Sequence, residues 1–264
     1  MSVELFELTM LGGAAERRYR RLRPEVERLP WGTLNPSQYP AALVARARRI
    51  WTEAAFQEHR TGAACAATLK ALIAARAPLD LIGMATRFPL DEMVHVEMCA
   101  RLAMELGGGI GIQHDPTQMI AEPNPAATAL MQAAELVVRN FCVGEALSIP
   151  VLRGSWHAAK HPLIKAVLGR IVKDEAAHGQ FGWMFLDWAA DELTAIDRRE
   201  LAKAARLTID AVIDRWKSID PADEEGDSLG WMESRSYLEL AHRSLRTAVL
   251  APLRKRGIDP GEVG

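Results

Sequence analysis

Two stretches of the chain repeat one arrangement of acidic residues and histidine, Asp-Glu-x-x-His. The copies are Asp91, Glu92 and His95 in "FPLDEMVHVEM", and Asp174, Glu175 and His178 in "IVKDEAAHGQ". In each copy the glutamate and the histidine are three positions apart, so on a helix they project from the same face. Both copies stand in otherwise apolar sequence, where a charged side chain is costly to bury alone. Carboxylate and imidazole groups in this pattern predict metal ligation.

A bundle that holds two metal ions needs one more carboxylate opposite each pair. The flanking helical stretches offer four glutamates, Glu53 and Glu58 in the first and Glu135 and Glu145 in the third. In antiparallel helices, residues at equal height are equidistant from the turn that joins them. Glu58 and Glu92 are centred on the "RAPLD" turn, and Glu145 and Glu175 on "AAKHP". The other two glutamates would miss these turns by several residues, so Glu58 and Glu145 are predicted.

The predicted ligands are therefore Glu58, Glu92, His95, Glu145, Glu175 and His178. Four carboxylates and two neutral imidazoles carry a charge of −4, which two divalent cations neutralise. Oxygen and nitrogen ligands without thiolate suit iron or manganese, and zinc is an alternative. Asp91 and Asp174 are predicted to accept hydrogen bonds from the metal-bound histidines, with each aspartate serving the histidine of the other motif.

The elements that position these residues are predicted to be helices. Ala, Leu, Arg and Glu dominate the chain, and this composition favours helix over strand. The predicted helices cover 4–23, 41–75, 79–106, 126–156, 162–193, 197–218 and 229–255, with the acidic loop "DPADEEGDS" between the last two. Pro89 and Pro150 are expected to kink their helices beside the ligands.

The predicted fold class is all-α, with one domain over residues 1–264. Four helices within 41–193 form the core, 1–40 adds a helix and a loop, and 197–264 adds helices that pack on the core. A net charge of −2 gives no electrostatic reason to expect nucleic acid or a membrane as partner. The start, "MSVELFELTM", lacks the layout of a signal peptide, so a cytoplasmic location is expected.

Several side chains near the ligands are predicted to face the bundle interior and a substrate pocket. They are Cys65, Phe88, Cys99, Phe141, Cys142, Ile149 and Ile171. The three cysteines form no CxxC motif, so neither a disulfide framework nor a cysteine zinc site is indicated. Small buried hydrophobes are the simpler interpretation of these thiols, and a pocket or redox role is the alternative.

The repeated motif resembles the di-iron carboxylate proteins of the ferritin-like superfamily, over about residues 45–190. The matching neighbourhoods are "FQEHRTGAACA", "LDEMVHVEMCARLA", "FCVGEAL" and "VKDEAAHGQFGW". The resemblance implies a ferritin-like four-helix bundle with extra N-terminal and C-terminal helices. It also implies two iron ions on the six predicted ligands, with manganese or a mixed manganese–iron pair as the alternative.

The same resemblance implies that O2 binds between the metals and is reduced there. A rubredoxin-type CxxC module is absent from the sequence, and Tyr19, Tyr39 and Tyr237 lie outside the four core helices. Arylamine N-oxygenases of this layout carry an additional histidine where this chain has Ile171, which disfavours N-oxygenation. The expected function is a di-iron oxygenase or oxidase acting on a small organic substrate.

The partners that this function requires follow from what the sequence lacks. No flavin or NAD fingerprint is present, so an external ferredoxin or reductase is expected to supply electrons. A homodimer is a further expectation. The chief alternative is a metal-handling or peroxide-scavenging ferritin-like protein without an organic substrate, and a third is a bundle with a vestigial site.

Overall fold

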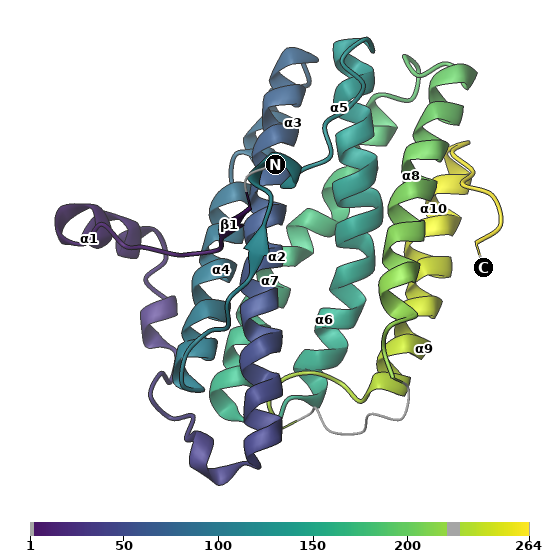
Figure 1. Ribbon diagram of the computed structural model, residues 1–264. Coiled ribbons are helices and arrows are strands. Elements are labelled where there is room, and N and C mark those ends of the chain that lie inside the picture. Colours follow the sequence, from purple (N-terminus) through teal and green to yellow (C-terminus); the bar gives the residue numbers. More distant parts are fainter. Residues whose placement is uncertain (1–2, 221–227, 264) are drawn as a thin grey trace.

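The computed structural model describes residues 3–220 and 228–263, which fold mainly into helices (Figure 1). The four-helix core is antiparallel, and its first, second and fourth helices are α2, α4 and α7. Their bounds are Ala41–Ala74, Phe88–Glu105 and Pro162–Trp188. The third is built from α5 (Ala129–Val137), the π-helix η4 (Val138–Glu145) and α6 (Ala146–Ala158). The prediction of an all-α ferritin-like bundle is confirmed.

The second predicted helix, 79–106, is in fact two helices. A short α3 (Leu79–Ala85) ends before Thr86, and α4 begins at Phe88. Pro89 stands in the first turn of α4, where its missing N–H costs no helical hydrogen bond. The proline therefore marks the start of α4 instead of kinking a longer helix. Pro150, by contrast, lies inside α6.

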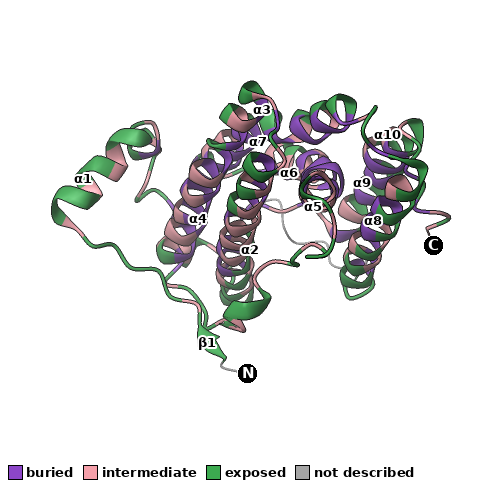
Figure 2. Ribbon diagram, turned by 90° about the horizontal axis from the view of Figure 1, so that it is seen from above, coloured by how far each residue is buried: buried purple, intermediate pink, exposed green. Residues whose placement is uncertain are grey.

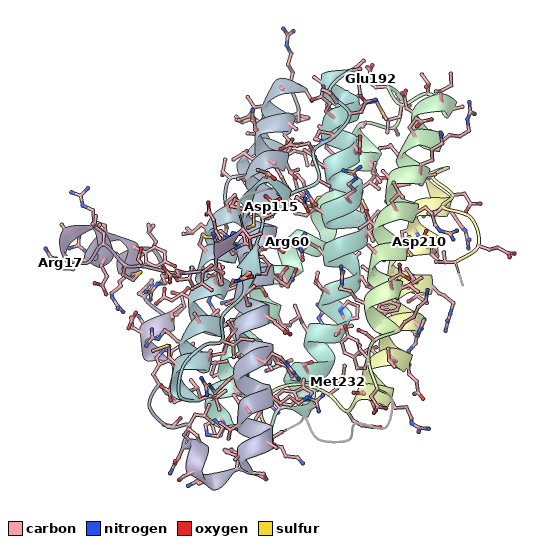
Figure 3. All side chains as sticks on the ribbon, in the orientation of Figure 1. Arg17, Arg60, Asp115, Glu192, Asp210 and Met232 are labelled. Carbon is pink, nitrogen blue, oxygen red and sulfur yellow. The ribbon has the colours of Figure 1, made fainter. Side chains whose placement is uncertain are left out.

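The N-terminal helix is shorter than the predicted 4–23. Residues Glu4–Leu5 form strand β1, which pairs antiparallel with β2 (Gln113–His114), and α1 covers only Gly13–Leu22. Gly12 and Gly13 both have positive φ, 78° and 56°, which breaks the chain direction before α1. Helix α1 stands apart from the bundle and contains no buried residue (Figure 2), with Arg17 pointing outward (Figure 3).

The segment after α1 returns the chain to the bundle. It contains the short 3₁₀-helices η1 (Val26–Arg28) and η2 (Pro36–Gln38), and Val26 is fully buried. A third 3₁₀-helix, η3 (Pro116–Gln118), lies in the loop that follows β2. The N-terminal segment thus enters the apolar core at Val26 of η1, and α1 contacts the bundle through the Tyr19 hydroxyl, which donates to the Met93 carbonyl.

The C-terminal helices form an additional layer against the third core helix. They are α8 (Ala195–Trp216), α9 (Ser234–Ser244), the π-helix η5 (Leu245–Leu250) and α10 (Ala251–Lys255). Thr194 and Asp197 cap the start of α8 reciprocally. Most of the predicted acidic loop, 221–227, lies outside the described residues. No helix within the described ranges is long and apolar enough to cross a membrane.

The apolar core consists of two clusters. The Trp51 cluster, between the N-terminal half of α2, the C-terminal half of α4 and the start of α7, includes Trp51, Met98, Leu102, Leu163 and Ile171. The Phe181 cluster, which extends to the C-terminal layer, includes Leu72, Phe88, Phe141, Phe181 and Phe185. Glu58, Glu92, Glu175 and His178 lie between the two clusters along their helices, whereas His95 lies at the edge of the Trp51 cluster and Glu145 at the edge of the Phe181 cluster.

Candidate metal centre

The structure brings all six predicted ligands together. Their ligand atoms form two overlapping groups, each with all atoms within 4.8 Å of one another. The first group is Glu58, Glu92, His95 and Glu175, and the second group is Glu92, Glu145, Glu175 and His178. Glu92 and Glu175 belong to both groups, so either carboxylate is placed to bridge two ions.

Each group takes three residues from one helical hairpin and one from the other. The α2–α4 hairpin provides Glu58, Glu92 and His95, and its helices pack closely where Gly62 faces α4. A Cβ atom at Gly62 would lie 2.4 Å from Cε of Met93 and 3.2 Å from Cβ of Glu92. A larger residue there would therefore require the Met93 side chain to move and would press on Glu92.

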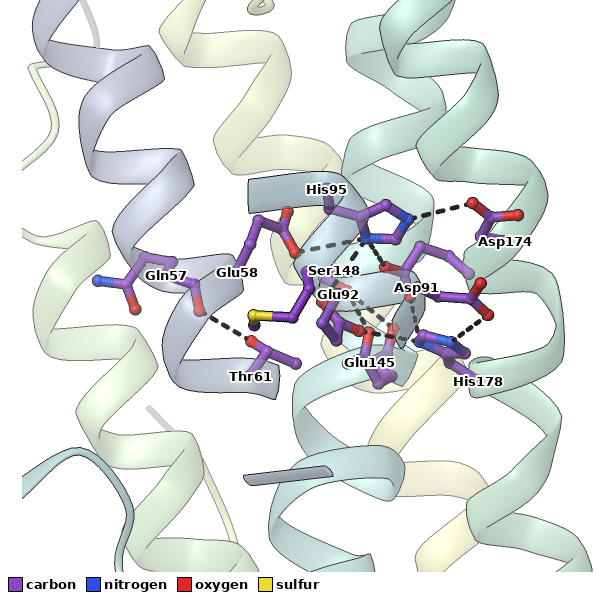
Figure 4. Close-up of polar contacts among 12 residues, drawn as sticks. Gln57, Glu58, Thr61, Asp91, Glu92, His95, Glu145, Ser148, Asp174 and His178 are labelled. Carbon is purple, nitrogen blue, oxygen red and sulfur yellow. Dashed lines mark hydrogen bonds and ion pairs between the residues drawn. The ribbon is translucent and has the colours of Figure 1, made fainter. Parts of the chain in front are cut away.

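The histidine rings point their Nδ1 atoms at the carboxylates. His95 Nδ1 lies 3.3 Å from Glu175 and 3.6 Å from both Glu58 and Glu92 (Figure 4). His178 Nδ1 lies 3.0 Å from Glu175 and 3.1 Å from Glu92. Both imidazoles therefore present the same nitrogen to the space between the four carboxylates.

Burying these charged and polar side chains without cations costs free energy. The side chains of Glu92, His95 and His178 are fully buried, and Glu58 alone among the six keeps appreciable exposure, at 17%. Several of their polar atoms are buried with no hydrogen-bond partner among the described residues. These atoms are both carboxylate oxygens of Glu92, one of Glu175, Nδ1 of His95 and both ring nitrogens of His178. Buried polar atoms are normally satisfied, so this set indicates a missing ligand between them.

The two carboxyl groups that belong to one group each, Glu58 and Glu145, hold protons in the metal-free protein. Burial raises the pKa of Glu58 to about 8. The contact with His95 lowers this pKa, and the negative charge of Glu92 raises it. Burial raises the pKa of Glu145 well above its usual range, and the charges of Glu175 and Glu92 add to this. Both groups are therefore largely protonated at neutral pH when no metal is bound.

The shared carboxylates are charged in the metal-free protein, and the two histidines are protonated. Burial alone would raise the pKa of Glu92 and Glu175, but contacts with His178 and His95 lower both. Burial opposes the charge on His178, but Asp91 and the two shared carboxylates outweigh it and raise its pKa to about 12. The pKa of His95 is likewise raised well above its usual range. Protons thus take the place of cations in the metal-free centre.

This donor set fits two divalent cations. Three carboxylates and one imidazole face each position, and no thiolate takes part, which is the oxygen-rich chemistry that iron and manganese accept. Glu58, Glu92, His95 and Glu175 would hold one ion, and Glu92, Glu145, Glu175 and His178 the other. Replacing the held protons by two ions leaves the ligand set neutral overall.

Each aspartate of the repeated motif lies beside the histidine of the other hairpin. His95 Nε2 is 3.3 Å from Asp174, and His178 Nε2 is 3.7 Å from Asp91 (Figure 4). Asp91 pairs with Arg87 at 3.0 Å, and Asp174 pairs with Arg170. These contacts connect each imidazole to an arginine through one carboxylate.

The two arginines were not among the predicted site residues, although the sequence contains the signal. Arg87 stands four residues before Asp91, and Arg170 stands four before Asp174, so the full repeat is Arg-x-x-x-Asp-Glu-x-x-His. On a helix, residues four apart are neighbours. The repeat therefore predicts both ion pairs once its length is recognised.

The π-helix η4 ends at Glu145 and was also not predicted. A π-helix turn holds one more residue than an α-helix turn, so it rotates the side chains that follow, and such turns are frequent at functional sites. Ser148, on the next turn, donates a hydrogen bond at 3.3 Å to the carboxylate of Glu145. The local irregularity thus sets the direction of one ligand of the second group.

The predicted pocket residues are all buried, but they lie in different places. Burial raises the pKa of the Cys65 thiol, and the carboxylates of both groups act on it, so it lies near both. Burial also raises the pKa of the Cys99 thiol. The charges of Glu58 and Glu92 raise it further, and His95 lowers it, so Cys99 lies near the first group. Cys142 lies away from the centre, because the charged groups that act on its thiol are Arg256 and Asp187.

The aromatic residues form one wall beside His178. The Phe88 ring lies 4.3 Å from the His178 ring and 5.4 Å from that of Phe141. Phe181, which was not predicted, completes the wall at 5.1 Å from Phe88 and 4.9 Å from Phe141. Ile149 packs against α7 at Gly179, next to His178. Ile171 belongs to the Trp51 cluster, on the other side of the centre.

A third Glu-x-x-His pair shows that spacing alone does not make this site. Glu239 and His242 on α9 line a surface groove of about 520 Å³ together with Arg235, Arg243 and Arg246. The His242 ring packs on Trp216 at 4.9 Å. With arginines instead of carboxylates around it, this pair does not have the environment of a cation site.

Comparisons with known proteins bear on the fold. No protein-family model matches the chain, and no curated protein matches its sequence. Among solved structures, it is similar to a Synechococcus protein with aldehyde deformylating oxidase activity, at a TM-score of 0.57. The match covers 84% of this chain and 98% of that chain. The chain is a ferritin-like bundle. Because the two sequences are 15% identical, the likeness is one of fold.

Proposed function

We propose that this ferritin-like protein is a non-haem di-iron oxygenase or oxidase that uses O2 to oxidise a small organic substrate. The observation that carries the proposal is the pair of four-residue groups that share Glu92 and Glu175 in a buried site. Buried carboxylates with unpartnered oxygens are explained by cations, and two ions side by side are suited to O2 chemistry. Two bound ferrous ions would supply two of the electrons that the reduction of O2 requires, and the substrate and an external donor would supply the others.

The residues around the centre have defined roles in this proposal. The six ligands hold the ions, and four of them, Glu58, Glu145, His95 and His178, release protons when the ions bind. Glu58, the ligand with the greatest exposure, lies where water and small molecules reach the ions first. The aromatic wall of Phe88, Phe141 and Phe181 excludes water on the His178 side, which keeps electrostatic interactions in the site strong.

The substrate class proposed is a small molecule with an apolar part. The aromatic wall and Ile149 offer it an apolar surface beside the second group. The activity of the Synechococcus protein with the similar fold makes aldehydes the first compounds to test. An external ferredoxin or reductase is proposed as the electron donor, and a homodimer as the assembly.

An anaerobic titration of the metal-free protein with Fe(II), followed by mixing with O2, tests the proposal. We expect saturation near two irons per chain and visible absorption bands that appear and decay after O2 is added. Consumption of an aldehyde with catalytic turnover in the presence of a chemical or protein reductant would then define the reaction.

Other results of these metal-binding and O2 experiments would favour a different function. Uptake of many more than two irons per chain would favour the alternative of a metal-handling protein. Reaction with peroxide but not with O2 would favour peroxide scavenging. Absence of tight Fe(II) and Mn(II) binding, with Glu175→Ala indistinguishable from the parent, would exclude a dimetal centre.

A further inference from the structure

The two groups of ligands have similar inner residues but different outer support. In both, a histidine contacts an aspartate of the other hairpin, and an arginine one turn earlier pairs with that aspartate. Beyond this point the two groups differ. The first group is supported by a partly buried arrangement that extends to the N-terminal segment, whereas the support of the second group ends at the largely exposed Arg87.

At the first group the support is continuous. His95 Nε2 lies within hydrogen-bond distance of Asp174, at 3.3 Å, so Nδ1 is left free to face the carboxylates. Asp174 pairs with Arg170, whose side chain is 13% exposed. Arg170 donates to the carboxylate of Glu25 at 2.7 Å. The guanidinium is thus held between two carboxylates, one on its own helix and one from a segment 145 residues earlier.

Glu25 is itself on a firmly held segment. Its neighbour Val26 is fully buried. Arg23, 1% exposed, donates to Glu97 on α4 at 2.7 Å. The Tyr19 hydroxyl donates to the backbone carbonyl of Met93, between the ligands on α4. These contacts fix the segment against the same helix that carries His95.

At the second group the support is loose. Asp91 lies 3.7 Å from His178 Nε2, and this nitrogen has no hydrogen-bond partner among the residues described. Arg87, which pairs with Asp91, has a side chain that is 66% exposed. Exposed ion pairs contribute little because solvent screens them and the side chains are mobile.

We propose that Arg170 and Glu25 are positioning residues for the first group, and that they make it the higher-affinity metal site. Glu25 fixes the guanidinium of Arg170, Arg170 fixes Asp174, and Asp174 holds the His95 ring with Nδ1 toward the metal position. The inference rests on the proposed dimetal centre. It adds that the two positions are unequal, and that a segment outside the four-helix core causes the inequality.

The physical reason is preorganisation. A histidine ligand whose other nitrogen is hydrogen-bonded has its tautomer and ring orientation set before the metal arrives. Loss of such an outer partner typically lowers metal affinity about 10–100-fold. A ring without that hydrogen bond must be oriented when the ion binds, and its affinity is lower.

The test measures Co(II) binding by the metal-free, full-length protein, one group at a time. His178→Ala leaves an imidazole only in the first group, and His95→Ala leaves one only in the second. In the His178→Ala background we expect Arg170→Gln to weaken Co(II) binding about 10–100-fold, and Glu25→Gln to weaken it in the same direction. In the His95→Ala background the same substitutions should change the affinity less than about fivefold.

Arg87→Gln is the matched control, because it removes the equivalent arginine of the other motif. It should change Co(II) affinity less than about fivefold in either background, as expected for an exposed pair. Arg170→Lys, which keeps the charge, should recover part of the affinity that Arg170→Gln loses. A purely structural role of Arg170 would weaken both groups alike and would not produce this difference between the backgrounds.

Two results would overturn the inference. Equal weakening of both groups by Arg170→Gln, or no weakening of the first, would show that the arginine does not position His95. Glu25→Gln, on a side chain that is 44% exposed, gives a second reading if Arg170→Gln fails to fold. If the unsubstituted protein binds no Co(II), Fe(II) or Mn(II), the proposed dimetal centre fails and this inference fails with it.

Discussion

At the scale of the residue, the six candidate ligands are not equivalent. Glu92 and Glu175 each lie in both four-residue groups, whereas Glu58 and Glu145 each lie in one. The two shared carboxylates also have lowered pKa values, so they are charged before any ion arrives. Glu58 and Glu145 must lose protons first. Shared and unshared glutamates should therefore respond differently to substitution.

We expect Glu175→Gln to abolish tight binding of both ions, because an amide oxygen lacks the charge that two cations share. Glu58→Gln should instead leave the second group able to bind, so that about one iron per chain remains. Metal analysis after anaerobic loading and desalting measures both. Equal iron contents in the two variants would contradict the bridging position of Glu175.

Metal binding should release protons in a pH-dependent manner. At pH 7 the metal-free centre holds protons on Glu58, Glu145, His95 and His178, because the pKa of each is raised. Filling both positions should therefore release close to four protons, and fewer above pH 8, where Glu58 has already lost its own. Calorimetry in buffers of different ionisation enthalpy counts the protons released.

The sign of the pH effect on stability follows from Glu58. Its pKa is about 8 in the fold and near its usual value in the unfolded chain, so the folded metal-free protein binds the proton more tightly. This contribution to the free energy of unfolding is fully present below about pH 4 and is lost as the pH rises to 8. Metal binding reverses the dependence, since ions and protons compete for the same oxygens.

At the scale of the element, the third core helix and α7 approach closely around η4. A Cβ at Gly182 of α7 would lie 2.7 Å from Sγ of Cys142, 3.0 Å from Cβ of Phe141 and 3.1 Å from the backbone nitrogen of Cys142. The Cβ atom and the backbone nitrogen among them cannot move without the helix backbone. Glycine is required here for packing and not for a turn.

Gly182→Ala should lower the free energy of unfolding by about 1–3 kcal/mol, the cost of overpacking a dense core. Gly83→Ala in α3 is the matched control, because nothing lies within 4 Å of the added Cβ. There alanine should stabilise the helix by up to about 1 kcal/mol. Denaturant unfolding of the metal-free proteins measures both changes, and opposite signs are expected.

The sequence predicts the long helices well, because their apolar periodicity is local. The 41–75 prediction agrees with α2, and the position of Glu58 opposite Glu92 follows from the turn between the hairpin's helices. The π-helix η4 packs against α7 and α8, and these contacts join segments that are distant in the sequence. The Glu25–Arg170 pair could not be predicted from the sequence either, because it joins residues 145 positions apart.

At the scale of the whole molecule, the candidate centre separates the Trp51 cluster from the Phe181 cluster. Charged residues from three core helices and from η4 thus lie in the middle of the apolar interior. Without ions, protonation alone compensates for their burial. The stability of the entire bundle should therefore depend on metal.

Metal loading should raise the melting temperature. Free metal at about 1,000 times the dissociation constant adds about 4 kcal/mol per site, and for a chain of this size about 2–4 °C accompanies each kcal/mol. With both sites filled, an increase of about 15–30 °C is expected for the parent, and almost none for Glu175→Gln. Calorimetric scans with and without a chelator compare the two.

Each hairpin contributes one glutamate to the group of the other hairpin, and this symmetry has an evolutionary consequence. The α2–α4 hairpin lends Glu92 to the second group, and the other hairpin lends Glu175 to the first, so the two halves are related as by a two-fold axis. Two copies of one ancestral hairpin, each with two glutamates and one histidine, would form the same six-residue arrangement without any new ligand. Duplication and fusion of a single short gene is thus a sufficient origin for the centre, and a later N-terminal extension bearing Glu25 would have made its halves unequal.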